Sequence, residues 1–296
     1  MDFKAVNTQC ISAGWLTDKK ISLDILRLDK IDAIVSGNKY FKLKYYLQNA
    51  IAANKKVIAT FGGAWSNHIV ATAFACNELG LKSIGFIRGE KPAVLSATLI
   101  AAESYGMELR FVTREEYRNK DLIKIKHFSE DWYGINEGGF GATGAKGAAE
   151  ILRLANHNTY THIVAAVGTG TMMAGLVISA SANQKIIGIS SMKGNNSLEA
   201  EIKSLSESAA SDSSFQLFHN YHFGGYGKHP KDLLDYINKI YLLHNLPLDI
   251  IYTGKTFYAI EDLAKQDFFP AESKILMIHS GGLQGNRSLP PEVLAF

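Results

Sequence analysis

A lysine at the start of a predicted helix is the first residue of this sequence that points to covalent chemistry. Residues 36–38, Ser-Gly-Asn, are typical of a loop or helix cap, and an apolar helical pattern begins directly after them. Lys39 would then lie in the first turn, where the helix dipole disfavours a positive charge, with Lys42 on the same face. Both effects favour a neutral amine, which a nucleophilic lysine requires. A surface helix that happens to carry three lysines is the alternative.

A glycine-rich turn follows the predicted strand 162–167. The turn consists of Gly168, Thr169, Gly170 and Thr171, and a helix is expected to begin near Met172. Strand, glycine-rich turn and helix N-terminus together form an anion site, so we expect a monophosphate to bind there. The dinucleotide fingerprint would need a third glycine where Met173 stands. An ordinary tight turn is the alternative.

A second strand-to-helix turn covers residues 61–68 and reads Phe-Gly-Gly-Ala-Trp-Ser-Asn-His. Ser66 and the backbone amides at the helix start suit a substrate carboxylate. Asn67 can donate to a phenolate oxygen, and His68 is a candidate proton carrier or orienting donor. The alternatives are a simple Ser-Asn helix cap and a structural histidine.

Other motifs are weaker when each is taken alone. Tyr226 and Tyr252 lie in glycine-containing turns, but tyrosines beside glycines often only pack over a turn. The segment 139–146 has the look of a nucleotide P-loop, yet Ala145 follows Gly144 where the motif requires lysine. A nucleotide-using enzyme is therefore a weaker hypothesis.

Short apolar runs alternate with amphipathic stretches and predict the elements that must position these residues. Strands are expected at 22–28, 55–61, 82–87, 108–113, 162–167, 185–190 and 274–279, and helices at 67–79, at 93–105 and from 172. Strands separated by helices favour right-handed crossovers and parallel sheets covered on both faces. We therefore predict an α/β protein with two parallel-sheet lobes, joined by the glycine-rich segment 134–147.

The composition excludes several other classes of protein. The 31 basic and 28 acidic residues nearly balance, so neither nucleic acid nor a membrane surface is an expected partner. No apolar run approaches the roughly 20 residues of a membrane span, and the N-terminus lacks a signal-peptide profile. The two cysteines, Cys10 and Cys76, are expected to be free thiols in a reducing compartment. We predict a cytoplasmic protein.

Taken together and in this order, the motifs resemble those of the 1-aminocyclopropane-1-carboxylate (ACC) deaminases and D-cysteine desulfhydrases. These are pyridoxal 5′-phosphate (PLP) enzymes with the tryptophan synthase β-subunit fold, and the resemblance runs from Leu26 to Asn286. It implies a PLP site in the cleft between a large cofactor-binding domain, 1–45 with 150–296, and a small substrate domain, 46–149. It also implies a homodimer, a small amino acid as substrate, and no metal ion.

The resemblance also implies individual roles. Lys39 would bind PLP covalently, Ser66 would bind the substrate carboxylate, and Asn67 would lie beside the pyridoxal ring. The remaining cofactor residues would be Lys42, Thr253 and the phosphate cup Gly168, Thr169, Gly170, Thr171 and Met172. The remaining substrate residues would be His68, Tyr226 and Tyr252, with both tyrosines, Ser66 and Lys39 as the catalytic set.

Thr253 bears on the choice of reaction, because the resemblance places it at the pyridine nitrogen, where ACC deaminases carry glutamate. A hydroxyl leaves that nitrogen neutral, which suits elimination of a good leaving group such as sulfide, and His68 in place of glutamine favours the same reaction. We predict a D-cysteine desulfhydrase-like α,β-elimination to pyruvate, sulfide and ammonia. Lys39, or a relay through Tyr226 or Tyr252, would remove the Cα proton.

Several alternatives remain open. ACC ring-opening to 2-oxobutanoate and ammonia is the first, and another PLP-dependent elimination or replacement is the second. A non-catalytic, two-lobed small-molecule binding protein would need neither Lys39 nor the phosphate cup. Two departures from the family pattern bear on the substrate: a short stretch before Lys39, and Met172 where many relatives have threonine.

Overall fold

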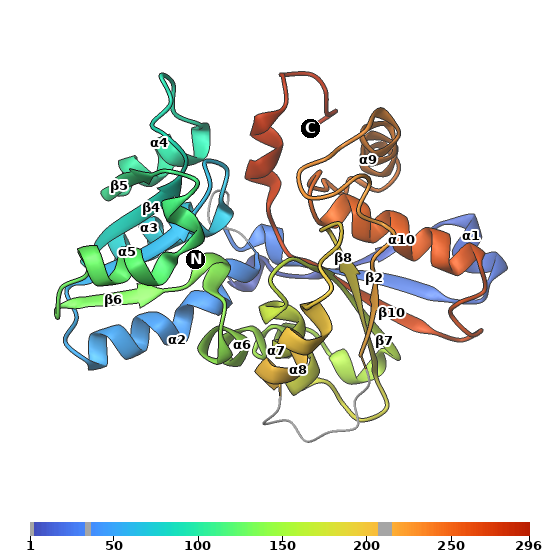
Figure 1. Ribbon diagram of the computed structural model, residues 1–296. Helices are drawn as coiled ribbons and strands as arrows, with labels where there is room; N and C mark the ends of the chain where they lie inside the picture. The colour runs from blue at the N-terminus through green and yellow to red at the C-terminus, as the bar shows by residue number, and fades with distance from the viewer. Residues whose placement is uncertain (1–2, 33–36, 207–214) are drawn as a thin grey trace.

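The computed structural model describes residues 3–32, 37–206 and 215–296 of the chain. Two sheets form the framework, a four-stranded one in the order β5-β4-β3-β6 and a six-stranded one in the order β1-β2-β10-β7-β8-β9. Helices pack around each sheet, which gives the two lobes seen in Figure 1. Among the described residues, no helix has the length and apolar character needed to cross a membrane.

All strands of the four-stranded sheet run parallel. Its strands are β3 (Val57–Gly62), β4 (Lys82–Arg88), β5 (Met107–Val112) and β6 (Trp132–Ile135). Its helices are α2 (Asn38–Ala52), α3 (Asn67–Glu78), α4 (Ala97–Ser104) and α5 (Lys120–His127). Every residue of β3 is buried, which explains its continuous apolar sequence.

The six-stranded sheet is parallel except for its edge strand β1, which pairs antiparallel with β2. Its strands are β1 (Thr8–Ile11), β2 (Ser22–Arg27), β7 (His162–Val167), β8 (Lys185–Ser190), β9 (Phe215–Phe218) and β10 (Lys274–His279). Its helices are α1 (Gly14–Asp18), α6 (Ala142–Ala148), α7 (Thr171–Ser179), α8 (Leu198–Ser206), α9 (Lys231–His244) and α10 (Thr253–Lys265).

Side chains of the central strand β10 alternate between the two faces of this sheet. Ile275 and Met277 pack into the core that α9 and α10 cover, whereas Leu276 and Ile278 pack into the opposite core, under α6, α7 and α8. Both faces of the sheet are therefore buried, which leaves the strand ends as the places where polar side chains can gather.

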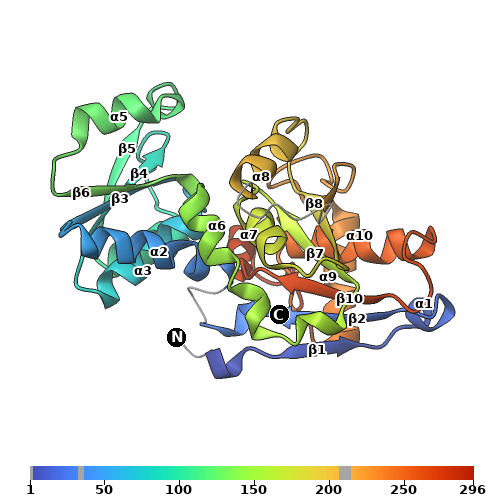
Figure 2. The same cartoon turned by 90° about the horizontal axis from the view of Figure 1, so that it is seen from below.

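The glycine-rich segment that leaves β6 joins the two sheets. It passes through the short 3-10 helix η4 (Glu137–Gly139) into α6, and Figure 2 shows this stretch crossing from one lobe to the other. A second 3-10 helix, η7 (Leu283–Ser288), packs beside α4 of the other lobe. The predicted domain boundary at residues 45 and 46 falls within α2, and the division into domains stays a prediction.

The predicted fold class is confirmed: the molecule is α/β, with parallel strands in two sheets. One predicted helix is shorter than expected, because α4 begins at Ala97 and not near residue 93. The hydroxyl of Ser96 accepts from the Leu99 backbone N–H and so caps this later start. Three short strands, β1, β6 and β9, were not expected from the sequence.

Candidate active site

The predicted site residues lie where the carboxyl ends of strands from the two sheets face each other. Ligands in open parallel sheets bind at such strand ends. The turn after β3 carries Ser66 and Asn67, the turn after β7 carries the glycine-rich loop, and the turn after β10 contacts the start of α2. The fold thus brings together segments that lie far apart in the sequence.

The start of α2 is held by the turn that follows β10. Gly37 adopts φ 81°, and a Cβ atom there would lie 1.9 Å from the Ser280 carbonyl oxygen. The Asn38 backbone N–H donates to that same oxygen at 3.1 Å. Lys39, the second residue of the helix, is half-buried and donates to Asn38 Oδ1 at 2.7 Å. Ser36, predicted as a loop or cap residue, lies outside the described residues.

Two lysine amines share this buried region. Burial lowers the pKa of Lys39 to about 8, although the nearby Asp249 carboxylate partly opposes the shift. Burial, and then the charge of Lys39, lower the pKa of Lys42 well below its usual range. The predicted direction of the Lys39 shift agrees with the structure, but desolvation and not the neighbouring lysine is its main cause. Lys42 Nζ donates to the Gly138 carbonyl at 3.4 Å.

His68 is buried beside both lysines in a defined tautomer. The Thr60 hydroxyl donates to the Ile135 carbonyl at 2.9 Å, so it must accept from His68 Nε2–H, which lies 2.8 Å away. His68 Nδ1 therefore carries no proton and can accept a hydrogen bond, and no described residue donates one to it. Burial, with the charges of both lysines, lowers the pKa of His68 to about 3. In this tautomer Nδ1 can accept from a donor, and the role of His68 stays a prediction.

The turn after β3 leaves polar groups available at the N-terminus of α3. Ser66 is the N-cap residue, but its hydroxyl makes no capping bond within the described structure. Asn67 Oδ1 is buried and has no hydrogen-bond partner among the described residues. A Cβ atom on Gly282 would lie 3.2 Å from Asn67 Nδ2, so the glycine lets the turns after β3 and β10 approach each other.

The glycine-rich loop after β7 forms the predicted strand–turn–helix arrangement. Gly170 adopts φ 76°, and α7 begins at the next residue, so backbone N–H groups point out of the helix start. The hydroxyls of Thr169 and Thr171 lie 3.3 Å apart, with Thr171 fully buried. Met172 Sδ accepts from Asn38 Nδ2 at 3.1 Å, which links this loop directly to the helix of Lys39.

The two predicted tyrosines meet at the edge of this loop. The ring centroids of Tyr226 and Tyr252 are 6.1 Å apart at an interplanar angle of 66°. A Cβ atom on Gly168 would lie 3.4 Å from the Tyr252 hydroxyl, so glycine leaves room for the ring. Burial and the neighbouring Tyr226 raise the pKa of Tyr252 well above its usual value, which keeps the phenol protonated.

Thr253 lies against a buried carboxylate that the sequence analysis missed. Its hydroxyl donates to Asp249 Oδ2 at 2.6 Å and accepts from the Asp249 backbone N–H at 2.7 Å. Asp249 is 1% exposed and also accepts from the backbone N–H groups of residues 251, 252 and 253. The role of Thr253 at a pyridine nitrogen stays a prediction. No helix start was predicted at Thr253, so the sequence carried no signal for Asp249.

These groups suit the cofactor that the resemblance implies. A phosphate needs backbone N–H groups and hydroxyls at a helix start, which the Gly168–Thr171 loop offers, and the Lys42 amine at Gly138 is a further donor near Thr169. A phenolic oxygen needs a donor, which the Asn67 Nδ2 amide group beside Gly282 can supply. An amine with a pKa of about 8 is partly neutral at neutral pH, as an attacking lysine must be.

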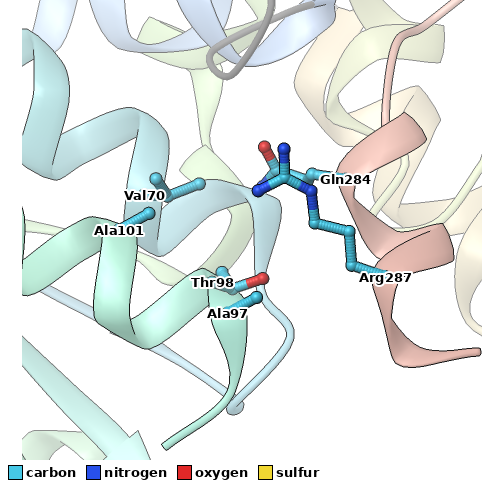
Figure 3. A pocket seen from close by; sticks show the side chains of 6 residues that line it. All are labelled: Val70, Ala97, Thr98, Ala101, Gln284 and Arg287. Atoms are coloured by element: carbon cyan, nitrogen blue, oxygen red, sulfur yellow. The ribbon is translucent and has the colours of Figure 1, made fainter.

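A small cavity lies next to this site but is separate from it. It has a volume of about 10 Å³ and lies between α3, α4 and η7. Figure 3 shows Thr98, Gln284 and Arg287 pointing into it from the two lobes. This volume matches a single water molecule and not a cofactor.

Comparison with known proteins identifies relatives over nearly the whole chain. A family model described as pyridoxal-phosphate dependent enzyme matches residues 13–281. A Pyrococcus horikoshii protein named as a candidate ACC deaminase is 28% identical over 291 residues, covering 90% of this chain and 87% of its own. An Arabidopsis thaliana protein named bifunctional D-cysteine desulfhydrase/ACC deaminase is 26% identical, covering 85% and 70%. The solved structure of an ACC deaminase homologue has a TM-score of 0.82 and 26% identity, covering 95% and 90%.

Proposed function

The chain belongs to the pyridoxal-phosphate dependent enzymes, and on this premise we propose that it catalyses α,β-elimination on a small amino acid, with D-cysteine as substrate. Family membership confirms the predicted cofactor and, with the ACC deaminase homologue, the predicted tryptophan synthase β-like fold. Pyruvate, sulfide and ammonia would be the products. The observation that carries the proposal is the partly neutral Lys39 amine beside a loop suited to phosphate.

We propose that PLP is held by residues from both lobes. Lys39 would bind it covalently, the Gly168–Met172 loop would bind its phosphate, and Asn67 would donate to its phenolic oxygen. The Lys42 amine, which donates to the Gly138 carbonyl, would be a further N–H donor to it. When bound, PLP supplies an electron sink that weakens the bonds around the substrate Cα atom.

The choice of elimination over ring-opening is supported by the surroundings of Thr253. The Asp249 carboxylate already accepts four hydrogen bonds, so it offers no further acceptor to a ligand. The Thr253 hydroxyl donates its single proton to that carboxylate, so a pyridine nitrogen beside Thr253 would meet no free carboxylate and would stay neutral. A weak electron sink is sufficient when the leaving group is as good as sulfide.

Separate residues would perform the proton transfers and the binding. The Lys39 amine would accept the Cα proton, since its pKa of about 8 suits a base near neutral pH. Tyr252, whose raised pKa keeps its proton in place, would donate a hydrogen bond to the sulfur that departs as HS⁻. Ser66 and the N–H groups at the start of α3 would bind the carboxylate, and His68 Nδ1 would accept from a donor and so fix orientation.

The test compares wild-type protein with Lys39→Ala and with the control Lys44→Ala. Lys44 lies on the same helix but pairs with Glu150 outside the site. We expect a visible absorbance band that borohydride bleaches, and sulfide and pyruvate release from D-cysteine, in the wild type and the control only. Release of 2-oxobutanoate from ACC without sulfide from D-cysteine would favour the deaminase. Amino-acid binding that survives Lys39→Ala with no turnover in any variant would favour the binding protein.

We also propose a cytoplasmic homodimer: the dimer comes from the family resemblance alone, and the location from the sequence features described above. Light scattering coupled to size-exclusion chromatography is expected to give twice the 32.5 kDa mass of the chain. A monomeric mass for an active sample would contradict it.

A further inference from the structure

Lys255 is a fully buried lysine that the proposed chemistry does not use. It is the third residue of α10 and is 0% exposed. Its Nζ donates to the carbonyl oxygens of His222 and Gly225, both at 2.9 Å. A buried ammonium is costly unless it is hydrogen-bonded, so the position of this lysine depends on those two carbonyls.

The two carbonyls belong to a tight loop, residues 222–228, whose backbone is unusual. Phe223, Gly224, Gly225 and Gly227 have φ values of 51°, 93°, 124° and 72°. The loop also has bonds of its own. The N–H groups of Gly225 and Lys228 donate to the carbonyls of His222 and Gly225, the Gly224 N–H donates to His222 Nδ1, and the Gly227 carbonyl is bonded to His229 Nδ1. A backbone conformation of this kind persists only when the surrounding structure supports it. The Lys255 ammonium is a charged donor that α10 offers to the loop carbonyls.

This loop carries Tyr226, one of the two tyrosines of the site. Tyr226 is 53% exposed and contacts the described structure through the Tyr252 ring, 6.1 Å away between centroids. Tyr252 immediately precedes α10, three residues before Lys255. The start of α10 is therefore connected to both tyrosines. Tyr252 directly precedes it in the chain, and the loop of Tyr226 is hydrogen-bonded to it through the Lys255 ammonium. Burial lowers the pKa of Lys255 to about 8, against the opposing charge of Asp249.

We propose that Lys255 is a positioning residue that fastens the 222–228 loop to α10 and so places Tyr226 against Tyr252 at the mouth of the site. It acts through the loop backbone and does not touch the substrate. The role of Tyr226 rests on the proposed function, but the attachment of the loop does not, and the two can be tested separately.

The attachment is tested on the holoenzyme by amide hydrogen exchange in Lys255→Met. The control is Lys265→Met, the same substitution at the far end of the same helix, where the lysine pairs with Glu261 near the surface. We expect the amides of residues 224–228 to exchange at least about tenfold faster in Lys255→Met only. Lys255→Gln, which keeps an N–H donor, is expected to restore part of the protection. Unchanged exchange in Lys255→Met would overturn the proposal.

The link to Tyr226 is tested by a double-mutant cycle on kcat/KM with D-cysteine. Lys255→Met is expected to lower kcat/KM by about tenfold to a hundredfold in the wild-type background. In the Tyr226→Ala background its effect should fall below about twofold, because the side chain that it positions is gone. An equal effect in both backgrounds would overturn the link. If no variant turns over D-cysteine, the proposed substrate fails while the exchange result still stands.

A third measurement covers the case in which the substitutions unfold the chain. Competitive acetylation of the wild-type enzyme reports the accessibility of each lysine. Lys255 is expected to react no faster than the 224–228 amides exchange, since its amine is freed only when the loop opens. Faster acetylation than exchange would show that the loop does not depend on this amine and would overturn the proposal.

Discussion

Asp249→Asn is the substitution whose consequences the structure defines most fully. The Asp249 carboxylate is 1% exposed and accepts four hydrogen bonds, two on each oxygen. Asparagine has nearly the same shape but keeps only one carbonyl oxygen. One oxygen's pair of donors would therefore face an amide NH2 group, and two bonds to a charged acceptor would be lost.

The expected cost follows from these two bonds. A hydrogen bond to a charged group contributes about 1.5–3 kcal/mol, so their loss would cost about 3–6 kcal/mol. The donors lie at the start of α10, where the chain has some freedom to rotate, so we expect the lower end, about 3 kcal/mol. Urea unfolding followed by circular dichroism measures this difference. The control Asp235→Asn breaks an exposed pair with Lys231 and should change stability little.

The same substitution should change the pH at which the protein binds its cofactor. The Asp249 charge raises the pKa of Lys39, which is about 8, so removing the charge should lower that pKa. The rate at which apoprotein recombines with PLP rises as Lys39 loses its proton, and the midpoint of that rise should move to lower pH. A midpoint that stays fixed or moves upward, or stability equal to the wild type, would refute this account of Asp249.

Three further substitutions test single contacts. Gly37→Ala would put a methyl group 1.9 Å from a carbonyl oxygen and should abolish the visible cofactor band, which Gly14→Ala, in open space, should keep. Thr60→Val removes the acceptor of His68 Nε2–H and should lower kcat/KM about tenfold, measured by sulfide release; an unchanged value would show that the tautomer is unimportant. Tyr252→Phe should lower kcat by about tenfold to a hundredfold with little change in KM, and a loss confined to KM would exclude it as the hydrogen-bond donor to the departing sulfur.

Much of the fold was predictable because its central strands are buried on both faces. Strands such as β3 and β10 read as continuous apolar runs, and the predicted ranges agree with the observed ones to within two residues. The missed strands β1, β6 and β9 are four residues long and only partly buried, so they lack that signal. Their existence depends on a neighbouring strand that offers a free edge.

The sequence by itself determined the local motifs of the site. Each motif spans fewer than ten consecutive residues: a lysine in a first helical turn, a glycine-rich loop between strand and helix, and a Ser-Asn helix start. Their geometry follows from backbone rules that operate over one turn, so a first-turn position for Lys39, a tight turn at Gly170 and a helix start at Ser66 were predictable.

Only the tertiary structure decided which of these motifs contact each other and how far the pKa values of their side chains are shifted. The Asn38–Met172 contact spans 134 residues of sequence, and the bonds from Lys255 to its loop span 30 and 33. The His68 tautomer depends on Thr60 and on a carbonyl of a third segment. Burial, which sets the pKa of Lys39, is a property of everything packed around it. Such contacts between distant segments leave no periodic pattern in the chain, because each depends on where the folded sheets bring the backbone together.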